Sequence, residues 1–168
     1  MEGKNYINGA FVDGTSGDRF ESRNPANFDE ILGTFPLSSE QDVNNAVSAA
    51  KTAYDGWRRL SRIKRGEHFD EFVQLLKKDR EEISRLVTKE CGKGIVEGRA
   101  DVTEGIHMVQ YTFGTVRMPH GDVVDSEIPE KDAFMRRKPK GVVAAISPWN
   151  FPFAIPLWLI CPSVVEGN

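Results

Sequence analysis

Cysteine and histidine are scarce in this sequence, with two and three copies among 168 residues. Cys91 and Cys161 lie far apart, and neither belongs to a CxxC motif or to a Cys/His pair with the spacing of metal ligands. This argues against a disulfide scaffold and against a zinc site. His68, His107 and His120 share no spacing typical of a metal site or a catalytic triad, so we interpret them as solvated or structural histidines. No bound metal is expected.

Net charge and long apolar runs are also lacking. With 22 Lys and Arg against 25 Asp and Glu, the formal charge is −3, which argues against a nucleic-acid-binding surface. The longest apolar run, residues 151–165, is shorter than the roughly 20 residues that cross a bilayer, and prolines interrupt it. The first residues carry no apolar stretch of the kind found in secretory signals. We therefore expect a cytoplasmic protein without membrane attachment.

Turn signals dominate the first 24 residues. Asn8-Gly9 and Asp13-Gly14 accept positive φ angles at low steric cost, which makes such pairs the strongest short signals for hairpins. Short apolar and aromatic segments lie between them, so we predict an N-terminal β-meander. Residues 25–36, which have a proline at each end, are interpreted as a connecting segment.

Three helical stretches follow the N-terminal strands. The first begins at a capping box, Ser39-x-x-Asp42, and its apolar residues recur at intervals of three and four up to Trp57, which predicts one buried face. The second runs from about residue 61 to 91, with a restart capped by Asp79 and an end at Gly92.

The third helical stretch runs from about residue 95 to 118. Gly98, Gly105 and Gly114 each weaken it by about 1 kcal/mol relative to Ala, unless they mark positions of close packing.

After Pro119 the apolar spacing changes to two or to continuous runs, which indicates strands near residues 121–124 and 133–137. Residues 141–146 are almost entirely apolar and precede Pro148. This pattern predicts a strand buried on both faces of a parallel sheet. Ligand sites of open α/β sheets lie beyond the carboxyl ends of such strands.

Asn150 follows this apolar segment in an otherwise apolar setting. Because of this setting, we expect its side chain to be buried. A buried amide stays neutral at every pH and can stabilise negative charge that develops on an oxygen atom. The alternative is a turn residue that hydrogen-bonds its own backbone.

The flanking residues favour the first reading of Asn150. Residues 139–152, with Pro148-Trp149-Asn150-Phe151-Pro152 at their centre, strongly resemble the signature segment of the NAD(P)-dependent aldehyde dehydrogenase superfamily. Similar matches occur in four earlier segments: Tyr6-Ile7-Asn8-Gly9, Asn24-Pro25-Ala26, Arg65-Gly66 and Glu90-Cys91-Gly92-Lys93. The resemblance therefore covers nearly the whole chain.

This resemblance implies an α/β fold: the N-terminal part of the family's Rossmann-like cofactor domain, with three leading helices, a β-meander and an oligomerisation hairpin. Residues 1–120 and 141–168 would form part of the NAD(P)-binding domain, and residues 121–140 the hairpin. A homo-oligomer, dimer or tetramer, would assemble through this hairpin. The family's nucleophilic cysteine, general-base glutamate and glycine-rich cofactor turn lie later than Asn168, so the catalytic domain would be missing from this chain.

The resemblance also implies roles for individual residues. Asn150 would be the side-chain half of an oxyanion hole that holds the alkoxide formed when a cysteine thiolate attacks the aldehyde. The main chain along the nicotinamide and ribose of NAD or NADP would come from Ile146, Ser147, Pro148, Trp149 and Asn150. The substrate tunnel would be lined by Phe151, Ile155 and Trp158, which share one helical face, although each is equally suited to fill a core.

The expected activity of the intact enzyme is NAD(P)-dependent oxidation of a small aldehyde to a carboxylic acid through a thiohemiacetal and a thioester. The 168 residues alone are expected to be inactive, and neither of their cysteines is expected to be the nucleophile. Cys91 lies at a predicted helix C-terminus, whose dipole disfavours a thiolate. Two alternatives stay open: a truncated, non-catalytic interaction module, and a CoA-acylating relative in which a thiol replaces water.

Overall fold

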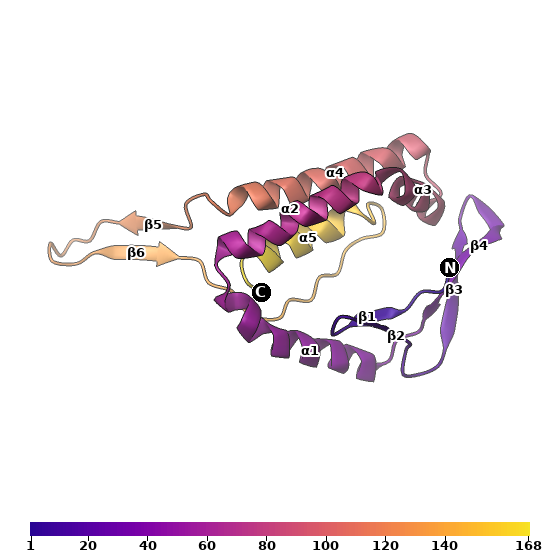
Figure 1. The fold of residues 1–168 in the computed structure, drawn as a ribbon, viewed down its shortest axis with the longest axis horizontal. Helices are drawn as coiled ribbons and strands as arrows, with labels where there is room; N and C mark the ends of the chain where they lie inside the picture. Colours follow the sequence, from indigo (N-terminus) through magenta and orange to yellow (C-terminus); the bar gives the residue numbers. More distant parts are fainter.

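The computed structural model describes all 168 residues and has three separate two-stranded antiparallel sheets beside a group of helices (Figure 1). The paired strands are β1 (Asn5–Ile7) with β2 (Ala10–Val12), β3 (Arg19–Asn24) with β4 (Asn27–Pro36), and β5 (Gly121–Val124) with β6 (Ala133–Arg136). The helices are α1 (Glu40–Arg59), α2 (Arg62–Lys78), α3 (Arg80–Cys91), α4 (Ile95–Thr115) and α5 (Ala154–Val165).

The N-terminal strands form two hairpins instead of one meander, because β2 does not pair with β3. Asn8 and Gly9 both have positive φ, at 52° and 77°, so the Asn-Gly turn closes the first hairpin as predicted. The second hairpin includes β4, so the interpretation of residues 25–36 as a connecting segment is wrong. The prolines suggested a break, but Pro25 lies in the turn and Pro36 is the last strand residue, where no further ladder bond is needed.

The helix ends follow the predicted capping signals. Ser39 and Asp42 form the capping box of α1, and the Ser61 side chain accepts a hydrogen bond from the Lys64 main chain at the start of α2. The predicted restart at Asp79 separates α2 from α3, and Gly92 ends α3 with a φ of 65°. Local chemistry therefore determines where these helices begin and end.

The hydrophobic core lies around α4, which packs against α2, α3 and α5. Val102 and Val109 of α4 are fully buried, and they are joined by residues such as Val73 of α2 and Cys161 of α5. Gly105 allows the close approach of α5, because a Cβ atom there would lie 2.6 Å from the ring of Phe153. Helices α2 to α5 thus form one packed unit.

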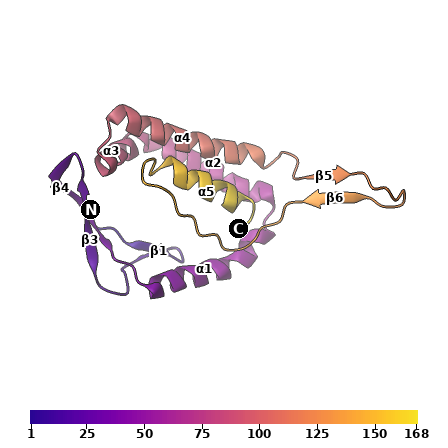
Figure 2. The same ribbon diagram turned by 180° about the vertical axis from the view of Figure 1, so that it is seen from behind.

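Helix α1 departs from its predicted burial. Its apolar residues, including Val43, are largely exposed, and Asp42 is its one buried residue. The helix runs apart from α4 in both views (Figures 1 and 2) and is joined to the rest mainly at its ends. Asp42 accepts hydrogen bonds from Thr15, and the Trp57 indole donates to the carbonyl of Val164 over 2.8 Å. Between these two points β1 contacts α1, and the apolar face of the helix is half-buried or exposed.

The β5–β6 hairpin projects away from the helices (Figures 1 and 2). Val123 and Phe134 face each other across its ladder and are 85% and 77% exposed. The two strands predicted from the change in apolar spacing are thus confirmed, and their apolar side chains have no cover within the chain.

The predicted buried strand over residues 141–146 is not found. These residues are extended but unpaired, and most are exposed. A parallel strand needs hydrogen-bonded neighbours on its sides, and none of the three hairpins lies in that position. The apolar pattern indicates that this segment is suited to lie between two neighbouring strands. These 168 residues do not supply such strands.

Helix α5 accounts for most of the apolar run over residues 151–165. One face packs on the core through Ala154, Leu157, Cys161 and Val165, but the opposite face is substantially exposed. Among the helices of this structure, none has the length and apolar character needed to cross a bilayer.

Candidate active site

The signature turn lies between the extended segment and α5, and it contacts the junction of α3 and α4. The Cys91 thiol, at the end of α3, lies 3.6 Å from the carbonyl oxygen of Trp149. Lys93, in the linker to α4, donates from Nζ to the carbonyl oxygen of Asn150 over 2.8 Å. Two residues far earlier in the sequence therefore hold the main chain on either side of the Asn150 amide.

Asp101 of α4 binds the main chain just after the same turn, at the start of α5. Its side chain is fully buried, and Oδ1 accepts a hydrogen bond of 2.9 Å from the main-chain N–H of Ala154. Ala154 is the first residue of α5, and Phe153 before it provides no side-chain cap. Asp101 therefore caps α5 from another helix, where the positive end of the helix dipole also favours a carboxylate.

Lys93 balances the buried charge of Asp101. Its Nζ lies 3.7 Å from Asp101 Oδ2 and 4.9 Å from the centre of the Phe151 ring, a geometry suited to a cation–π contact. The Lys93 side chain is only 16% exposed. A buried carboxylate without a cation would be costly, so one ammonium group both neutralises Asp101 and fixes the turn.

The Asn150 side chain is exposed in this structure, so its expected burial is not found. The reason is the same as for residues 141–146: no other segment of the chain covers this face. The side-chain amide makes no hydrogen bond to the rest of the chain, which also argues against the alternative of a self-bonded turn residue. The five principal cavities are lined by other residues. The amide donors are thus unpaired within the chain and exposed.

The residues expected to contact the cofactor lie together along the extended segment. Ile146 and Trp149 are 91% and 81% exposed, and Ser147 is half-buried. From Val142 to Pro148 the main chain makes no hydrogen bond within the protein. Main-chain donors and acceptors in this state are available to a polar ligand.

The three residues expected to line a substrate tunnel do not form one in this chain. Phe151 and Trp158 are partly exposed and Ile155 is half-buried. The alternative reading, that they fill the core, does not hold for Trp158. The core face of α5 carries Leu157 and Cys161 instead.

Neither cysteine is suited to nucleophilic catalysis. Burial raises the pKa of Cys161 to about 11. Burial also raises the pKa of Cys91, and the nearby charge of Lys93 only partly opposes this effect. Because the thiolate is the reactive form, both groups are poor nucleophiles near neutral pH.

Lys93 and Asp101 are functional candidates that the sequence analysis did not assign. Lys93 was present in the Glu90-Cys91-Gly92-Lys93 match, but its contact with Asn150 spans 57 positions and leaves no local pattern. Asp101 had a signal that was overlooked. It shares a helical face with Gly98, Val102 and Gly105, and a carboxylate among buried residues requires a buried partner.

Known proteins of the same architecture are aldehyde dehydrogenases. Residues 11–168 match the sequence profile of the aldehyde dehydrogenase family. Alpha-ketoglutaric semialdehyde dehydrogenase of Bacillus subtilis is 38% identical over 98% of this chain and 34% of its own length. Malonate-semialdehyde dehydrogenase of Lacticaseibacillus casei is 39% identical over 98% of this chain and 33% of its own length.

Solved structures show the same relationship. A putative methylmalonate-semialdehyde dehydrogenase from Sinorhizobium meliloti, complexed with NAD, superposes with a TM-score of 0.91 at 33% identity, over 100% of this chain and 34% of that protein. An NADP-dependent enzyme of E. coli gives a TM-score of 0.93 at 27% identity, over 99% and 34%. The chain thus spans about a third of its relatives' length, with the α/β fold of their N-terminal portion. It belongs to the aldehyde dehydrogenase family.

Proposed function

We propose that this chain supplies the oxyanion-hole amide and part of the cofactor site of an enzyme that oxidises aldehydes with NAD or NADP. The observation that carries the proposal is the Asn150 amide: exposed, free of internal hydrogen bonds, and held at its main chain by Lys93. Family membership supports the reaction class. The nucleophile and general base would come from the part of the relatives' length that these residues do not span.

In this proposal Asn150 acts by donating hydrogen bonds from its side-chain NH₂ to the oxygen of the aldehyde as negative charge develops there. The amide cannot titrate, so its contribution is independent of pH. One donor of this kind typically contributes about 2.7–4 kcal/mol to transition-state stabilisation. Lys93 and Asp101 are positioning residues, because they hold the turn and the start of α5 without reaching the substrate.

The segment from Ile146 to Asn150 is proposed to bind the nicotinamide end of the cofactor through its free main-chain groups. When bound there, NAD or NADP would supply the hydride acceptor for the oxidation. Phe151, Ile155 and Trp158 are proposed to form one apolar wall of the substrate tunnel. Several relatives are semialdehyde dehydrogenases by name, which supports a small semialdehyde as the substrate class.

The division of the chain is proposed to follow the same scheme. Residues 1–120 and 141–168 would belong to the cofactor-binding domain, and residues 121–140 would be an oligomerisation hairpin. The exposed apolar side chains of Val123 and Phe134 support this role, because large apolar groups on a projecting hairpin favour pairing with a second subunit.

The test is Asn150→Ala in the protein that carries the whole reading frame. We expect kcat to fall about 10²–10³-fold, with little change in NAD affinity, because only the transition state carries the full oxyanion charge. Asn44→Ala, at an exposed position of α1, is the matched control. Near-normal turnover in the Asn150 variant would refute the oxyanion role.

A second experiment separates the remaining alternatives. The purified 168-residue chain is expected to give no NADH signal with aldehydes, since both of its thiols are poor nucleophiles. With the whole protein, formation of a carboxylic acid supports hydrolysis of the thioester, and formation of an acyl-CoA in the presence of CoA supports the acylating alternative. Absence of oxidation by the whole protein would favour an interaction module.

A further inference from the structure

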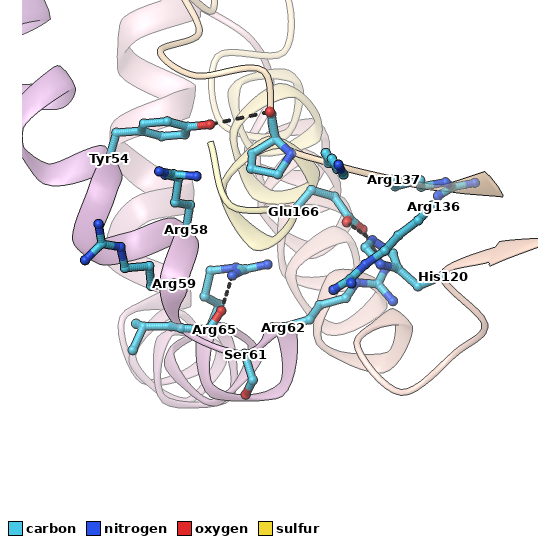
Figure 3. A pocket seen from close by; sticks show the side chains of 13 residues that line it. Tyr54, Arg58, Arg59, Ser61, Arg62, Arg65, His120, Arg136, Arg137 and Glu166 are labelled. Carbon is cyan, nitrogen blue, oxygen red and sulfur yellow. Dashed lines mark hydrogen bonds and ion pairs between the residues drawn. The ribbon is translucent and has the colours of Figure 1, made fainter. Parts of the chain in front are cut away.

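A basic cavity of about 500 Å³ lies where the end of α1, the start of α2, the base of the β5–β6 hairpin and the residue after α5 meet (Figure 3). Its volume falls in the range of small-molecule sites, roughly 300–1,000 Å³. Its lining is mostly polar and charged, which sets it apart from pockets for apolar ligands. It is also distinct from the signature turn, because the 12 residues of α5 separate them by about 18 Å.

The cavity has a large excess of positive charge. Its one acidic residue, Glu166, is already shared by Arg62 and His120, each at 2.6 Å. Five further cations in the lining have no carboxylate within ion-pairing distance: Arg59, Arg65, Arg136, Arg137 and Lys138. Figure 3 shows that these arginines come from α1, α2 and the hairpin base, on different sides of the pocket.

The start of α2 adds to this positive field. Its first turn has no acidic residue and instead carries Arg62, with Arg65 close behind. Helix N-termini have a positive partial charge and are stabilised by anions, so cations at this point are unfavourable on their own. Two independent contributions, side-chain charge and helix dipole, therefore favour an anion in this cavity.

Two of the arginines are fixed in place before any ligand arrives. Arg65 is buried and donates from Nε to the Val165 carbonyl over 2.8 Å and from Nη1 to the Leu60 carbonyl. Arg62 donates from Nη1 to the Thr115 carbonyl over 2.6 Å. Burial lowers the pKa of Arg65, and the charge of Arg62 lowers it further, while Glu166 raises it. Held guanidinium groups lose little entropy on binding an anion.

We propose that this cavity binds a small molecule with a diphosphate group. Arginine forks match phosphate oxygens in bidentate pairs, and several unpaired cations favour a ligand with several negative charges. The volume exceeds that of a single phosphate. Free pyrophosphate and the diphosphate of a nucleotide share this chemistry. The site is independent of the proposed dehydrogenase reaction and goes beyond it.

The test is calorimetric titration of the 168-residue chain with pyrophosphate and, separately, with ADP. The double variant Arg59→Gln/Arg137→Gln removes two exposed cations of the cavity, and circular dichroism checks that its fold is retained. We expect its affinity for pyrophosphate to fall about tenfold or more. The control, Lys51→Gln/Arg85→Gln, removes the same charge at exposed positions outside the cavity and should bind like the wild type.

The outcomes decide both the site and its ligand. Equal affinity for pyrophosphate and ADP would identify the diphosphate itself as the recognised group, and markedly tighter ADP binding would identify a nucleotide. Equal losses in the two double variants, or no heat with millimolar pyrophosphate and the wild-type chain, would overturn the proposal. Asn150→Ala should bind pyrophosphate normally, so the failure of either proposal leaves the other intact.

Discussion

Lys93 contacts three different residues of the candidate site. It contacts the carbonyl oxygen of Asn150, the carboxylate of Asp101 and the ring of Phe151. The contacts with Asn150 and Phe151 are long-range in sequence, which is why the residue type alone does not reveal its role. The flanking motif predicts a role for Asn150, but it does not show which residues hold its main chain in place.

Lys93→Met should destabilise the chain by about 3 kcal/mol, because it leaves the buried Asp101 carboxylate without a cation. Urea unfolding measures this loss. Lys89→Met is the control, since Lys89 forms an exposed pair with Glu30 and should cost at most about 1 kcal/mol. Comparable losses in both variants would show that Asp101 does not depend on Lys93.

In the whole protein, Lys93→Met should also lower kcat, with a smaller effect on the KM for NAD. The reason is that the turn that carries Asn150 is no longer held in place. Lys93→Arg should restore part of the turnover, since it keeps a cation near Asp101. A purely structural lysine would instead lower stability while leaving the ratio of kcat to KM in the folded fraction unchanged.

Glu166 should make stability depend on acidic pH. Burial alone would raise its pKa, but hydrogen bonds and charges from His120 and Arg62 lower it overall from the ordinary value of 4.5. The stabilisation is therefore complete above pH 4.5 and is lost as pH falls through the lower folded value. Glu166→Gln should make the melting temperature depend less on pH in this acidic range. An unchanged pH dependence would exclude Glu166 as the cause.

At the scale of elements, α4 shows what local sequence predicts well and what it does not. Its approximate span was predicted from apolar spacing, and the same holds for the capped starts of α1 and α2. The meaning of its glycines was left open. Gly105 is in close contact with Phe153, whereas Gly114 faces open space, a difference that only packing creates.

Opposite effects are expected from two identical substitutions in α4. Gly105→Ala should destabilise the chain by about 1–3 kcal/mol, because its new Cβ would collide with Phe153 and displace α5. Gly114→Ala should stabilise it by up to about 1 kcal/mol through helix propensity. Thermal or urea unfolding of the two variants measures the difference, and equal effects would contradict the packing described for α5.

At the scale of the whole molecule, burial was the least predictable property. The apolar face of α1 and the segment 141–146 are predicted to be buried, but that face is half-buried or exposed and most of the segment is exposed. Apolar periodicity shows which surface a segment is suited to bury, but it does not show whether the covering element lies in the same chain. Family resemblance predicts the architecture. The exposure of α1 and of residues 141–146 depends instead on which strands the 168 residues contain.

Assembly of the whole protein should depend on the hairpin. Val123→Lys/Phe134→Lys places charge at two exposed and opposed apolar positions, so it should shift the protein to a smaller species in light scattering after size exclusion. Glu127→Lys, near the hairpin tip, is the control for added charge. An unchanged mass in the double variant would place the subunit contact elsewhere.

The unpaired main chain from Val142 to Pro148 also affects how the molecule behaves in solution. Main-chain N–H and C=O groups without hydrogen bonds, beside valine and isoleucine side chains, are a template for strand addition. Copies of the chain are therefore able to associate there by strand pairing at high concentration. Pro139 and Pro148 bracket the segment and cannot donate to a ladder, which keeps the adhesive edge short. Aggregation of this chain should therefore begin next to the residues proposed for chemistry.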